Sequence, residues 1–258
     1  MASETHLSDI PRTVLVTGAA KRIGRALAED LGARGWAVAV HYNGSPTEAD
    51  EVAANIHKAG ARAVTIKADL ADAAETSALI PKAERALGPI GCLINNASIF
   101  ERDEADTATL GSWERHQAIN LRAPFFLTQA FARQLPSGAQ GVVINIIDQR
   151  IWNLTPHFIS YTVSKSGLWT LTQTLAMALA PRIRVNAIGP GPTLPSRYQT
   201  QAQFDRQQER MPLGRGTTPA EICAAARFIL EAPALTGQMI ALDGGQHLGW
   251  KQDAGDHE

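Results

Sequence analysis

Seven short and nearly continuous apolar runs, separated by segments of helix length, constrain the fold of this 258-residue chain most strongly. A strand that is apolar on both faces is buried on both faces, and in a parallel sheet the right-handed helical crossovers provide that cover. The pattern therefore predicts an α/β fold with a doubly wound, parallel, seven-stranded sheet and helices on both faces. The expected strands span residues 13–17, 37–42, 61–67, 92–95, 142–147, 184–188 and 238–242.

Size and composition predict one domain over residues 1–258, since a 45% hydrophobic chain of this length can form one large core. Residues 1–10 and 250–258 are expected to be loosely held termini. The net charge of −1 and the absence of a Lys/Arg-rich block make nucleic acid and membrane unlikely partners. No signal pattern is visible, so the cytosol is the expected location. Cys92 and Cys223 stand far apart without metal-ligand spacing, which predicts neither disulfides nor a metal site.

The carboxyl ends of the strands are the expected ligand site, because doubly wound sheets bind ligands at that edge. The segment 190–219 follows the sixth expected strand and is rich in proline and glycine. It is too long for a plain connector, so we interpret it as a mobile cover for the substrate. A surface excursion with a short helix of no special role is the alternative.

A glycine turn, Thr-Gly-Ala-Ala-Lys-Arg-Ile-Gly over residues 17–24, joins the first expected strand to a helical pattern over 25–34. Such a turn presents free N–H groups and the positive end of a helix dipole to a pyrophosphate. A plain turn after a strand is the alternative for the glycines alone. The expected cofactor contacts in this turn are Gly18, Arg22, Ile23 and Gly24.

The second expected strand ends in His-Tyr-Asn-Gly-Ser at residues 41–45 and carries no carboxylate. NAD-binding sheets usually place an acidic residue there to hold the ribose hydroxyls, so its absence favours NADP(H). The side chains of His41, Asn43 and Ser45, backbone N–H groups and Arg22 are candidate donors to the 2′-phosphate. For His41, a strand-end histidine with satisfied hydrogen bonds is the alternative. Further expected cofactor contacts are Tyr42, Asp69, Leu70, Asn96, Ala97 and Ser98.

Tyr161 and Lys165 stand four residues apart, and Asp148 lies thirteen residues upstream of the tyrosine. On a helix this spacing places the phenol and the ammonium on one face, where the lysine charge lowers the tyrosine pKa from its usual value of about 10. The pair is therefore a candidate proton donor. Asp148 is expected to hydrogen-bond the tyrosine or to donate a proton itself, and capping of a turn after the strand is the alternative for it.

Together these motifs resemble the short-chain dehydrogenases/reductases, over nearly the whole chain from residue 13 to residue 245. The resemblance implies a Rossmann-like fold, usually tetrameric, that moves hydride between a nicotinamide and a carbonyl, alcohol or C=N group. It also implies that Lys165 holds the nicotinamide ribose and that Asn120 orders a water chain. The motifs that carry it are Thr17-Gly18 with Gly24, Asn95-Asn96-Ala97, Asn120, Tyr161 with Lys165, and Pro190-Gly191, the last pair a cofactor contact.

Four departures from the family pattern make the chain similar to the pteridine reductase branch. Arg22 replaces a glycine of the turn, Asp148 replaces the usual serine, Ser98 replaces a glycine, and the aromatic Phe100 follows. In that branch the matching aromatic stacks on the pterin ring, while ordinary packing in a loop is the alternative for Phe100. The substrate contacts implied by this resemblance are Arg22, Ser98, Phe100, Asp148 and Tyr161.

The expected function is NADPH-dependent reduction of a pterin- or dihydrofolate-like C=N bond. A general carbonyl or 3-oxoacyl reductase of the same family is one alternative, and a non-catalytic dinucleotide-binding sensor is another. The expected oligomer is a homotetramer. Trp152, His157 and Tyr198 are interpreted either as pocket residues or as ordinary packing and surface residues.

Overall fold

The computed structural model describes residues 10–249 and contains a seven-stranded, all-parallel sheet in the order β3-β2-β1-β4-β5-β6-β7. The predicted α/β, Rossmann-like doubly wound fold is confirmed, and the strand bounds differ from the expected ones by at most two residues. The strands are β1 (Thr13–Val16), β2 (Ala37–Tyr42), β3 (Ala63–Lys67), β4 (Cys92–Asn95), β5 (Gly141–Ile146), β6 (Ile183–Pro190) and β7 (Met239–Leu242).

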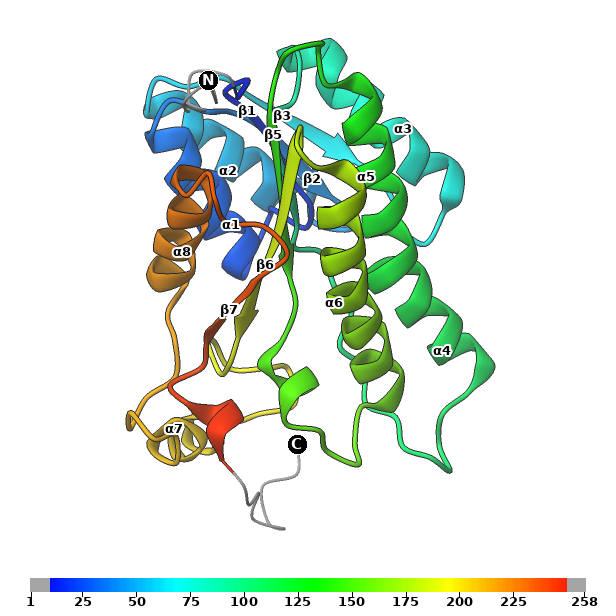
Figure 1. The fold of residues 1–258 in the computed structure, drawn as a ribbon. Helices are drawn as coiled ribbons and strands as arrows, with labels where there is room; N and C mark the ends of the chain where they lie inside the picture. The colour runs from blue at the N-terminus through cyan, green and yellow to red at the C-terminus, as the bar shows by residue number, and fades with distance from the viewer. Residues whose placement is uncertain (1–9, 250–258) are drawn as a thin grey trace.

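Helices cover both faces of the sheet (Figure 1). One face packs against α1 (Arg22–Ala33), α2 (Pro46–Lys58) and α8 (Pro219–Glu231). The other packs against α3 (Ala73–Leu87), α5 (Ala123–Gln134) and α6 (Ile159–Leu179), and α4 (Leu110–Gln117) leads into α5 through the π-helical turn η2 (Ala118–Arg122). None of the helices within residues 10–249 is both long enough and apolar enough to cross a membrane.

The core is divided by the sheet into two apolar layers, as the continuous apolar runs require. Leu27 and Leu31 of α1 pack with Ile56 of α2 in one layer, while Leu127 and Phe131 of α5 pack in the other. Each of these side chains is almost completely buried. At about 1.5–3 kcal/mol for each fully buried large apolar side chain, these layers are the main source of stability.

The N-terminal boundary of the fold begins one residue earlier than expected. Ile10 was expected to belong to a loosely held terminus, but it is buried in the layer that contains α1. That part of the expectation is wrong, because the apolar side chain of Ile10 closes the amino end of the sheet beside Gly91. The rest of the two expected loose termini, residues 1–9 and 250–258, lies outside the described residues.

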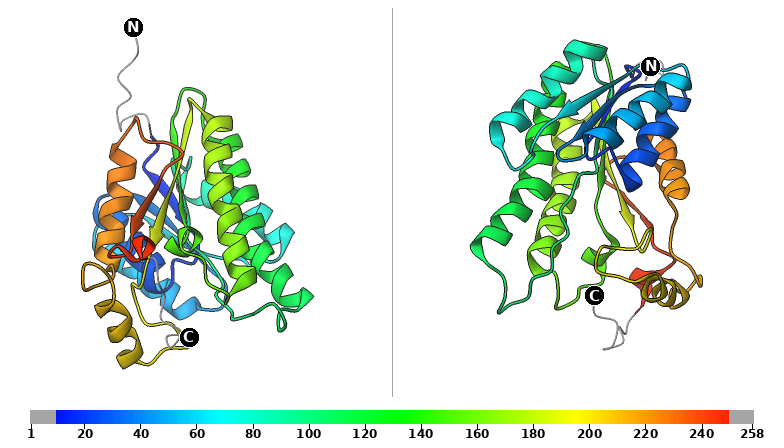
Figure 2. Two further views of the ribbon diagram at one scale, coloured as in Figure 1. Left: turned by 60° about the horizontal axis from the view of Figure 1, so that its bottom comes forward. Right: turned by 180° about the vertical axis from the view of Figure 1, so that it is seen from behind.

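The segment 190–219 contains the helix α7 (Gln201–Glu209) and lies across the carboxyl edge of the sheet. A capping box between Thr200 and Gln203 starts this helix, and Phe204 is its buried anchor. Two 3₁₀ turns, η3 (Gln149–Trp152) and η4 (Gln246–Leu248), lie at the same edge. The views in Figure 2 show α7 and η4 together at this end of the molecule.

A buried chain of polar side chains joins β4 and β5 to α6. The Asn95 amide donates to Asn145 Oδ1 at 2.8 Å, and the Asn145 amide donates to Thr172 Oγ1 at 2.9 Å. Thr172 in turn donates to the Leu168 carbonyl of α6 at 2.8 Å. All three polar side chains are buried, so these bonds have no solvent to replace them and they fix α6 against the sheet.

We expect Asn145→Ala to lower the free energy of unfolding by about 2–3 kcal/mol, because it leaves the buried Asn95 amide without an acceptor and opens a small cavity. Urea titration of the variant and the wild type measures this loss. Thr170→Ala, at an exposed position of α6, is the matched control and should change stability by less than about 0.5 kcal/mol. An equal loss in both variants would contradict a specific role for the buried chain.

Candidate active site

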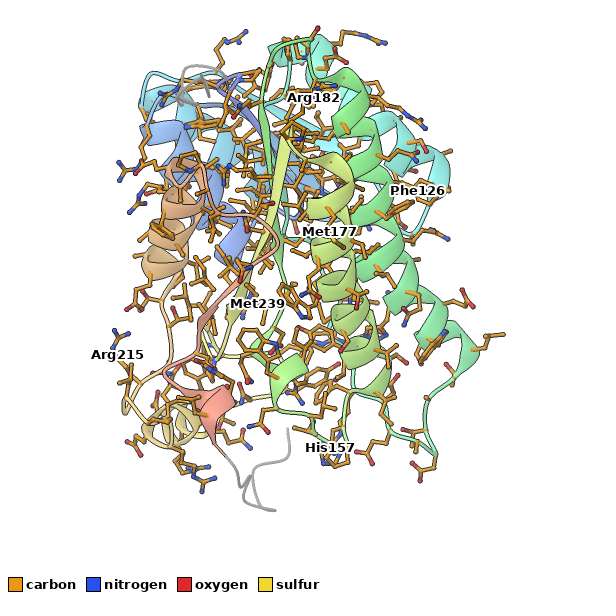
Figure 3. The ribbon with its side chains drawn as sticks, viewed as in Figure 1. Phe126, His157, Met177, Arg182, Arg215 and Met239 are labelled. Atoms are coloured by element: carbon orange, nitrogen blue, oxygen red, sulfur yellow. The ribbon has the colours of Figure 1, made fainter. Side chains whose placement is uncertain are left out.

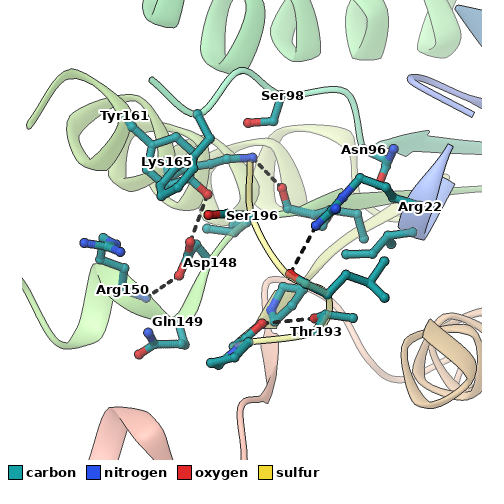
Figure 4. A pocket seen from close by; sticks show the side chains of 18 of the residues that line it. Arg22, Asn96, Ser98, Asp148, Gln149, Arg150, Tyr161, Lys165, Thr193 and Ser196 are labelled. Carbon is teal, nitrogen blue, oxygen red and sulfur yellow. Dashed lines mark hydrogen bonds between the residues drawn. The ribbon is translucent and has the colours of Figure 1, made fainter. Parts of the chain in front are cut away.

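A pocket of about 450 Å³ opens at the carboxyl ends of β1, β4, β5 and β6 (Figure 4). This is the edge that the sequence predicted, and it includes the switch between β1 and β4 where the strand order reverses. The segment 190–219 contributes one wall of the pocket, in line with its interpretation as a cover. The expected site residues that line the pocket are Gly18, Arg22, Ile23, Gly24, Asn96, Ala97, Ser98, Phe100, Asp148, Tyr161, Lys165, Pro190 and Gly191.

Tyr161 and Asp148 are in direct contact in the pocket. The Tyr161 hydroxyl donates to Asp148 Oδ2 at 2.9 Å, and Asp148 Oδ1 accepts the backbone N–H of Arg150 at 2.7 Å. Asp148 is thus both the N-cap of η3 and the partner of the tyrosine, so the two interpretations of this residue hold together. Capping fixes the carboxylate in the orientation that reaches the phenol (Figure 4).

Lys165 lies one turn beyond Tyr161 on α6, and only 2% of its surface is exposed. Its ammonium donates to the Ile146 carbonyl at the end of β5, at 2.8 Å, and lies 5.8 Å from the centre of the Tyr161 ring. Burial lowers the pKa of Lys165 to about 8, while the charge of Asp148 acts in the opposite direction. The side chain is therefore still mainly charged at neutral pH, close to the phenol.

Asn120 is buried in the π-helical turn and does not line the pocket. Its Oδ1 accepts the Ile99 N–H at 2.9 Å and the Ser98 hydroxyl at 3.2 Å. Its amide donates to the Ile99 carbonyl at 3.1 Å and to Ser164 Oγ at 3.0 Å. These four bonds use the whole side chain, which fastens the loop after β4 to α6 and has no free group to hold a water chain.

The turn between β1 and α1 is packed so closely that its two glycines are required. Gly18 has a φ of +63°, and a Cβ on Gly24 would lie 2.1 Å from the Gly18 carbonyl oxygen. The Asn96 amide donates to the carbonyls of Thr17 and Gly18, at 2.8 and 3.1 Å. The turn is thereby held against the end of β4, with Ala97 in contact with Gly18.

The N-terminus of α1 fits the phosphates of a dinucleotide. It has no side-chain cap and no acidic residue in its first turn, and it begins at the glycine turn beside the pocket. Uncapped N–H groups at the positive end of a helix dipole form an anion site. Helix α1 begins at Arg22, three residues before the expected start, directly at the glycine turn.

The region after β2 has donors suited to a 2′-phosphate, although these residues do not line the pocket itself. Asn43 is exposed and Ser45 is half-buried, and no carboxylate stands at the end of the strand. Lys21, which the sequence analysis missed, lines the pocket and pairs with Glu48 of α2 at 2.7 Å. Its position directly before the helix was the signal that could have found it. The other expected cofactor residues outside the pocket are His41, Tyr42, Asp69 and Leu70.

His41 differs from its expected role as a phosphate donor. Its Nδ1 accepts the Gly18 N–H at 2.9 Å, and its Nε2 lies 3.0 Å from the Ala68 carbonyl. Burial lowers the pKa of His41 to about 4, so the ring is neutral at physiological pH. With both nitrogens used by the backbone, the ring has no donor for a phosphate, and the alternative of a satisfied strand-end histidine describes it.

Arg22 connects the glycine turn to the segment after β6. It has a φ of 55°, a left-handed conformation at a position where Arg replaces a glycine. Its guanidinium donates to the carbonyls of Pro195 and Leu194, at 2.9 and 3.2 Å, as Figure 4 shows for one of the two bonds. Burial lowers the pKa of Arg22. The side chain therefore forms part of the pocket wall while it holds the covering segment.

An aromatic cluster forms another wall. The rings of Phe100 and Phe158 are stacked with their centres 4.2 Å apart, and the Tyr161 ring meets the edge of Phe100 at 4.8 Å. The Arg150 guanidinium lies over the Phe158 ring at 5.2 Å. Phe100 thus packs on Phe158, as the packing interpretation expects, and also lines the pocket, while its stacking on a pterin ring stays a prediction. Arg150 and Gln149 are further pocket residues that the sequence analysis missed, although both directly follow Asp148.

Tyr198, Trp152 and His157, which the sequence left as either pocket residues or packing and surface residues, have different surroundings. Tyr198 lies 6.4 Å from Phe100, ring centre to ring centre, next to the aromatic wall. Trp152 packs against Trp169 and His247, and His157 pairs with Glu104 at 2.8 Å. None of the three lines the pocket. Across residues 10–249, no group of His, Cys, Asp or Glu side chains is arranged to hold a metal ion.

The fold and the pocket define a class: a Rossmann-like protein with a dinucleotide turn at the switch point and a Tyr161–Lys165 pair beside it. The model of the short chain dehydrogenase family matches residues 12–206. A 3beta-hydroxysteroid dehydrogenase 1 from Eggerthella lenta is 32% identical over 92% of this chain and 94% of its own length. The chain therefore belongs to the short-chain dehydrogenase family, which consists of oxidoreductases.

Two further relatives differ in the activities that their names describe. A 3-oxoacyl-[acyl-carrier-protein] reductase from Synechocystis is 32% identical over 91% of this chain and 96% of its own. A crystal structure of FolM Alternative dihydrofolate reductase 1 from Brucella suis in complex with NADP is 46% identical. The match covers 96% of this chain and 98% of the Brucella suis chain, with a TM-score of 0.91.

We expect the free energy of unfolding to fall as the pH decreases from 6.5 towards 4, because only the unfolded chain protonates His41 in this range. The contribution of neutral His41 to the free energy of unfolding is fully present above pH 6.5, and up to roughly 3 kcal/mol of it is lost by pH 4. In His41→Asn the side chain does not titrate, so urea titrations from pH 4 to 7 should show a shallower pH dependence. An unchanged slope in the variant would rule out this coupling.

Proposed function

We propose that this short-chain dehydrogenase uses NADPH to reduce a C=N bond in a pterin-like ring. The observation that carries the proposal is the hydrogen bond between Tyr161 and Asp148 in a pocket walled by Phe100. A carboxyl group beside the phenol suits a substrate whose ring nitrogen must gain a proton, because two acids can then serve one site. A planar ring can lie against the exposed part of Phe100, whose other face is taken by Phe158.

Two observations support NADP(H) as the cofactor: the hydrogen-bond donors of this chain and the cofactor of a relative. When bound, the cofactor supplies the hydride. The uncapped start of α1, with Gly18, Ile23 and Gly24, would hold the pyrophosphate. Lys21, Asn43 and Ser45 would hold the 2′-phosphate, where no carboxylate repels it. Pro190 and Gly191 would contact the nicotinamide half, and the Brucella suis relative was solved in complex with NADP.

Proton transfer to the substrate is the task of Tyr161. The buried charge of Lys165 favours the tyrosinate that remains when the proton has left, since opposite charges attract strongly at a site with little water. Asp148 accepts the hydroxyl hydrogen in the resting site and so fixes the direction of the phenol. A proton that Asp148 takes up from solvent can then restore the phenol or pass directly to a ring nitrogen. Asn120 supports this arrangement by holding the loop that carries Ser98.

We also infer a homotetramer, as the family resemblance implies, and a cytosolic location. Exposed apolar side chains support association: Phe126 on α5 and Met177 on α6, both labelled in Figure 3, are 46% and 74% exposed. Phe228 on α8 is 56% exposed on the opposite side of the sheet. Two apolar surfaces on opposite sides are what a subunit with two different neighbours needs.

A substrate panel tests the proposed reaction. We expect the protein to reduce a 7,8-dihydropterin with NADPH. The reaction should be much slower when NADH replaces NADPH, or when an acetoacetyl thioester replaces the dihydropterin. Loss of NADPH absorbance in parallel assays measures the rates. Oxidation of NADPH with the thioester alone would overturn the pterin assignment and favour the 3-oxoacyl reductase alternative, which the Synechocystis relative represents.

Substitutions at the proton-donating pair test the mechanism. Tyr161→Phe removes the acid and should lower kcat by about 10²–10⁴-fold, which also separates an enzyme from a non-catalytic sensor. Asp148→Ser restores the residue usual in the family and should lower pterin reduction by at least about tenfold, since a serine cannot supply the proton. Steady-state kinetics with dihydropterin measures both. Full pterin reduction by Asp148→Ser would disprove the role of the carboxyl group.

A further inference from the structure

A second cavity, of about 330 Å³, adjoins the active-site pocket beside Phe100. It shares Arg22, Ser98, Phe100 and Ser196 with the main pocket, so the two cavities lie on either side of the same four residues. The walls that belong to this side cavity alone are Ile99, Glu101 and Arg197. A ring placed against Phe100 would therefore have a route for a substituent, away from the cofactor turn and between the loop after β4 and the loop after β6.

The charges around the side cavity are predominantly positive. Arg22 and Arg197 line it, and its one lining carboxylate, Glu101, also faces Arg115, with an N–O distance of 3.5 Å. Arg22 already donates to the Leu194 and Pro195 carbonyls, so two of its five N–H groups are used by the segment after β6. Arg197 donates from Nη2 to the Tyr198 hydroxyl at 2.5 Å, and its ion pair with Glu101 is long, at 3.8 Å, which leaves further N–H groups of the guanidinium for an anion.

Arg197 is placed to receive an anion at the outer end of the side cavity. Its side chain is 64% exposed, and its guanidinium lies over the Tyr198 ring, 4.8 Å from the centre. Tyr198 in turn lies 6.4 Å from Phe100, ring centre to ring centre. The arginine is therefore held near the aromatic wall without a short ion pair. A guanidinium in this state can form two parallel hydrogen bonds with an incoming carboxylate.

We propose that the side cavity holds an acidic arm on the substrate and that Arg197 binds its carboxylate. This inference rests on the proposed function and narrows the substrate class to reduced pterins that carry an aryl-glutamate arm, as dihydrofolate does. An unconjugated pterin would fill the main pocket and leave the side cavity and Arg197 without a ligand. Arg197 is thus a specificity-determining residue that acts on substrate binding, remote from the reacting bond.

The test compares two substrates that share the reduced ring, dihydrofolate with the acidic arm and 7,8-dihydrobiopterin without it. In Arg197→Gln we expect the KM for dihydrofolate to rise about tenfold with kcat little changed, as for the loss of one charge-assisted contact. The KM for dihydrobiopterin should change less than twofold. Arg206→Gln, an exposed arginine of α7 outside both cavities, is the matched control and should alter neither KM.

A second variant acts in the opposite direction. Glu101→Gln removes the carboxylate that competes for Arg197 and should lower the KM for dihydrofolate alone. Raising the salt concentration should increase the KM for dihydrofolate in the wild type and much less in Arg197→Gln, because salt screens an exposed ion pair. Thermal unfolding of each variant shows whether the fold is retained.

The outcomes separate this inference from the proposed function. If the wild type reduces both pterins but Arg197→Gln changes the two KM values equally, or changes neither, the acidic-arm assignment is wrong while the pterin reaction stands. Reduction of dihydrobiopterin alone by the wild type would also overturn the assignment. If the wild type reduces neither pterin, the proposed function itself fails, and the acidic-arm assignment fails with it.

Discussion

The close packing of the glycine turn against the end of β4 is the constraint on which the rest of the site depends. Gly24 approaches the Gly18 carbonyl too closely for any side chain, and the Asn96 amide and the His41 ring use the backbone groups of the turn. These contacts fix the start of α1 at the switch point of the sheet. Once the start of α1 is fixed, the uncapped helix end, the pocket and the segment 190–219 have defined positions relative to one another.

The buried Lys165 beside Tyr161 combines a stability cost with a proposed chemical use. Lys165 is buried with its charge, and desolvation lowers its pKa, which is a penalty that the fold bears. The Ile146 carbonyl and the charge of Asp148 compensate part of that penalty. The same low exposure makes the ammonium effective on the neighbouring phenol, because little water screens it. The proposed proton-transfer site thus includes a residue that a purely structural core would exclude.

The covering segment is attached to the site at defined points. Arg22 holds it from the glycine turn through two carbonyls, and the buried Phe204 of α7 anchors it at its helical part. The segment lines the main pocket with Thr193 and Leu194 and the side cavity with Arg197. Cofactor turn, substrate ring and substrate arm would therefore all meet one segment of the chain, which lets a single loop sequence set specificity.

The sequence alone determined the α/β class, the strand positions and half of the residues that line the pocket, because apolar periodicity, glycine turns and strand ends are local signals. Tertiary structure decided the roles that depend on burial and on partners far along the chain. His41 and Asn120 have their polar atoms used by the backbone and by neighbouring side chains, which no spacing reveals. Arg197 and Gln246 line the site only because the sheet brings distant loops to one edge.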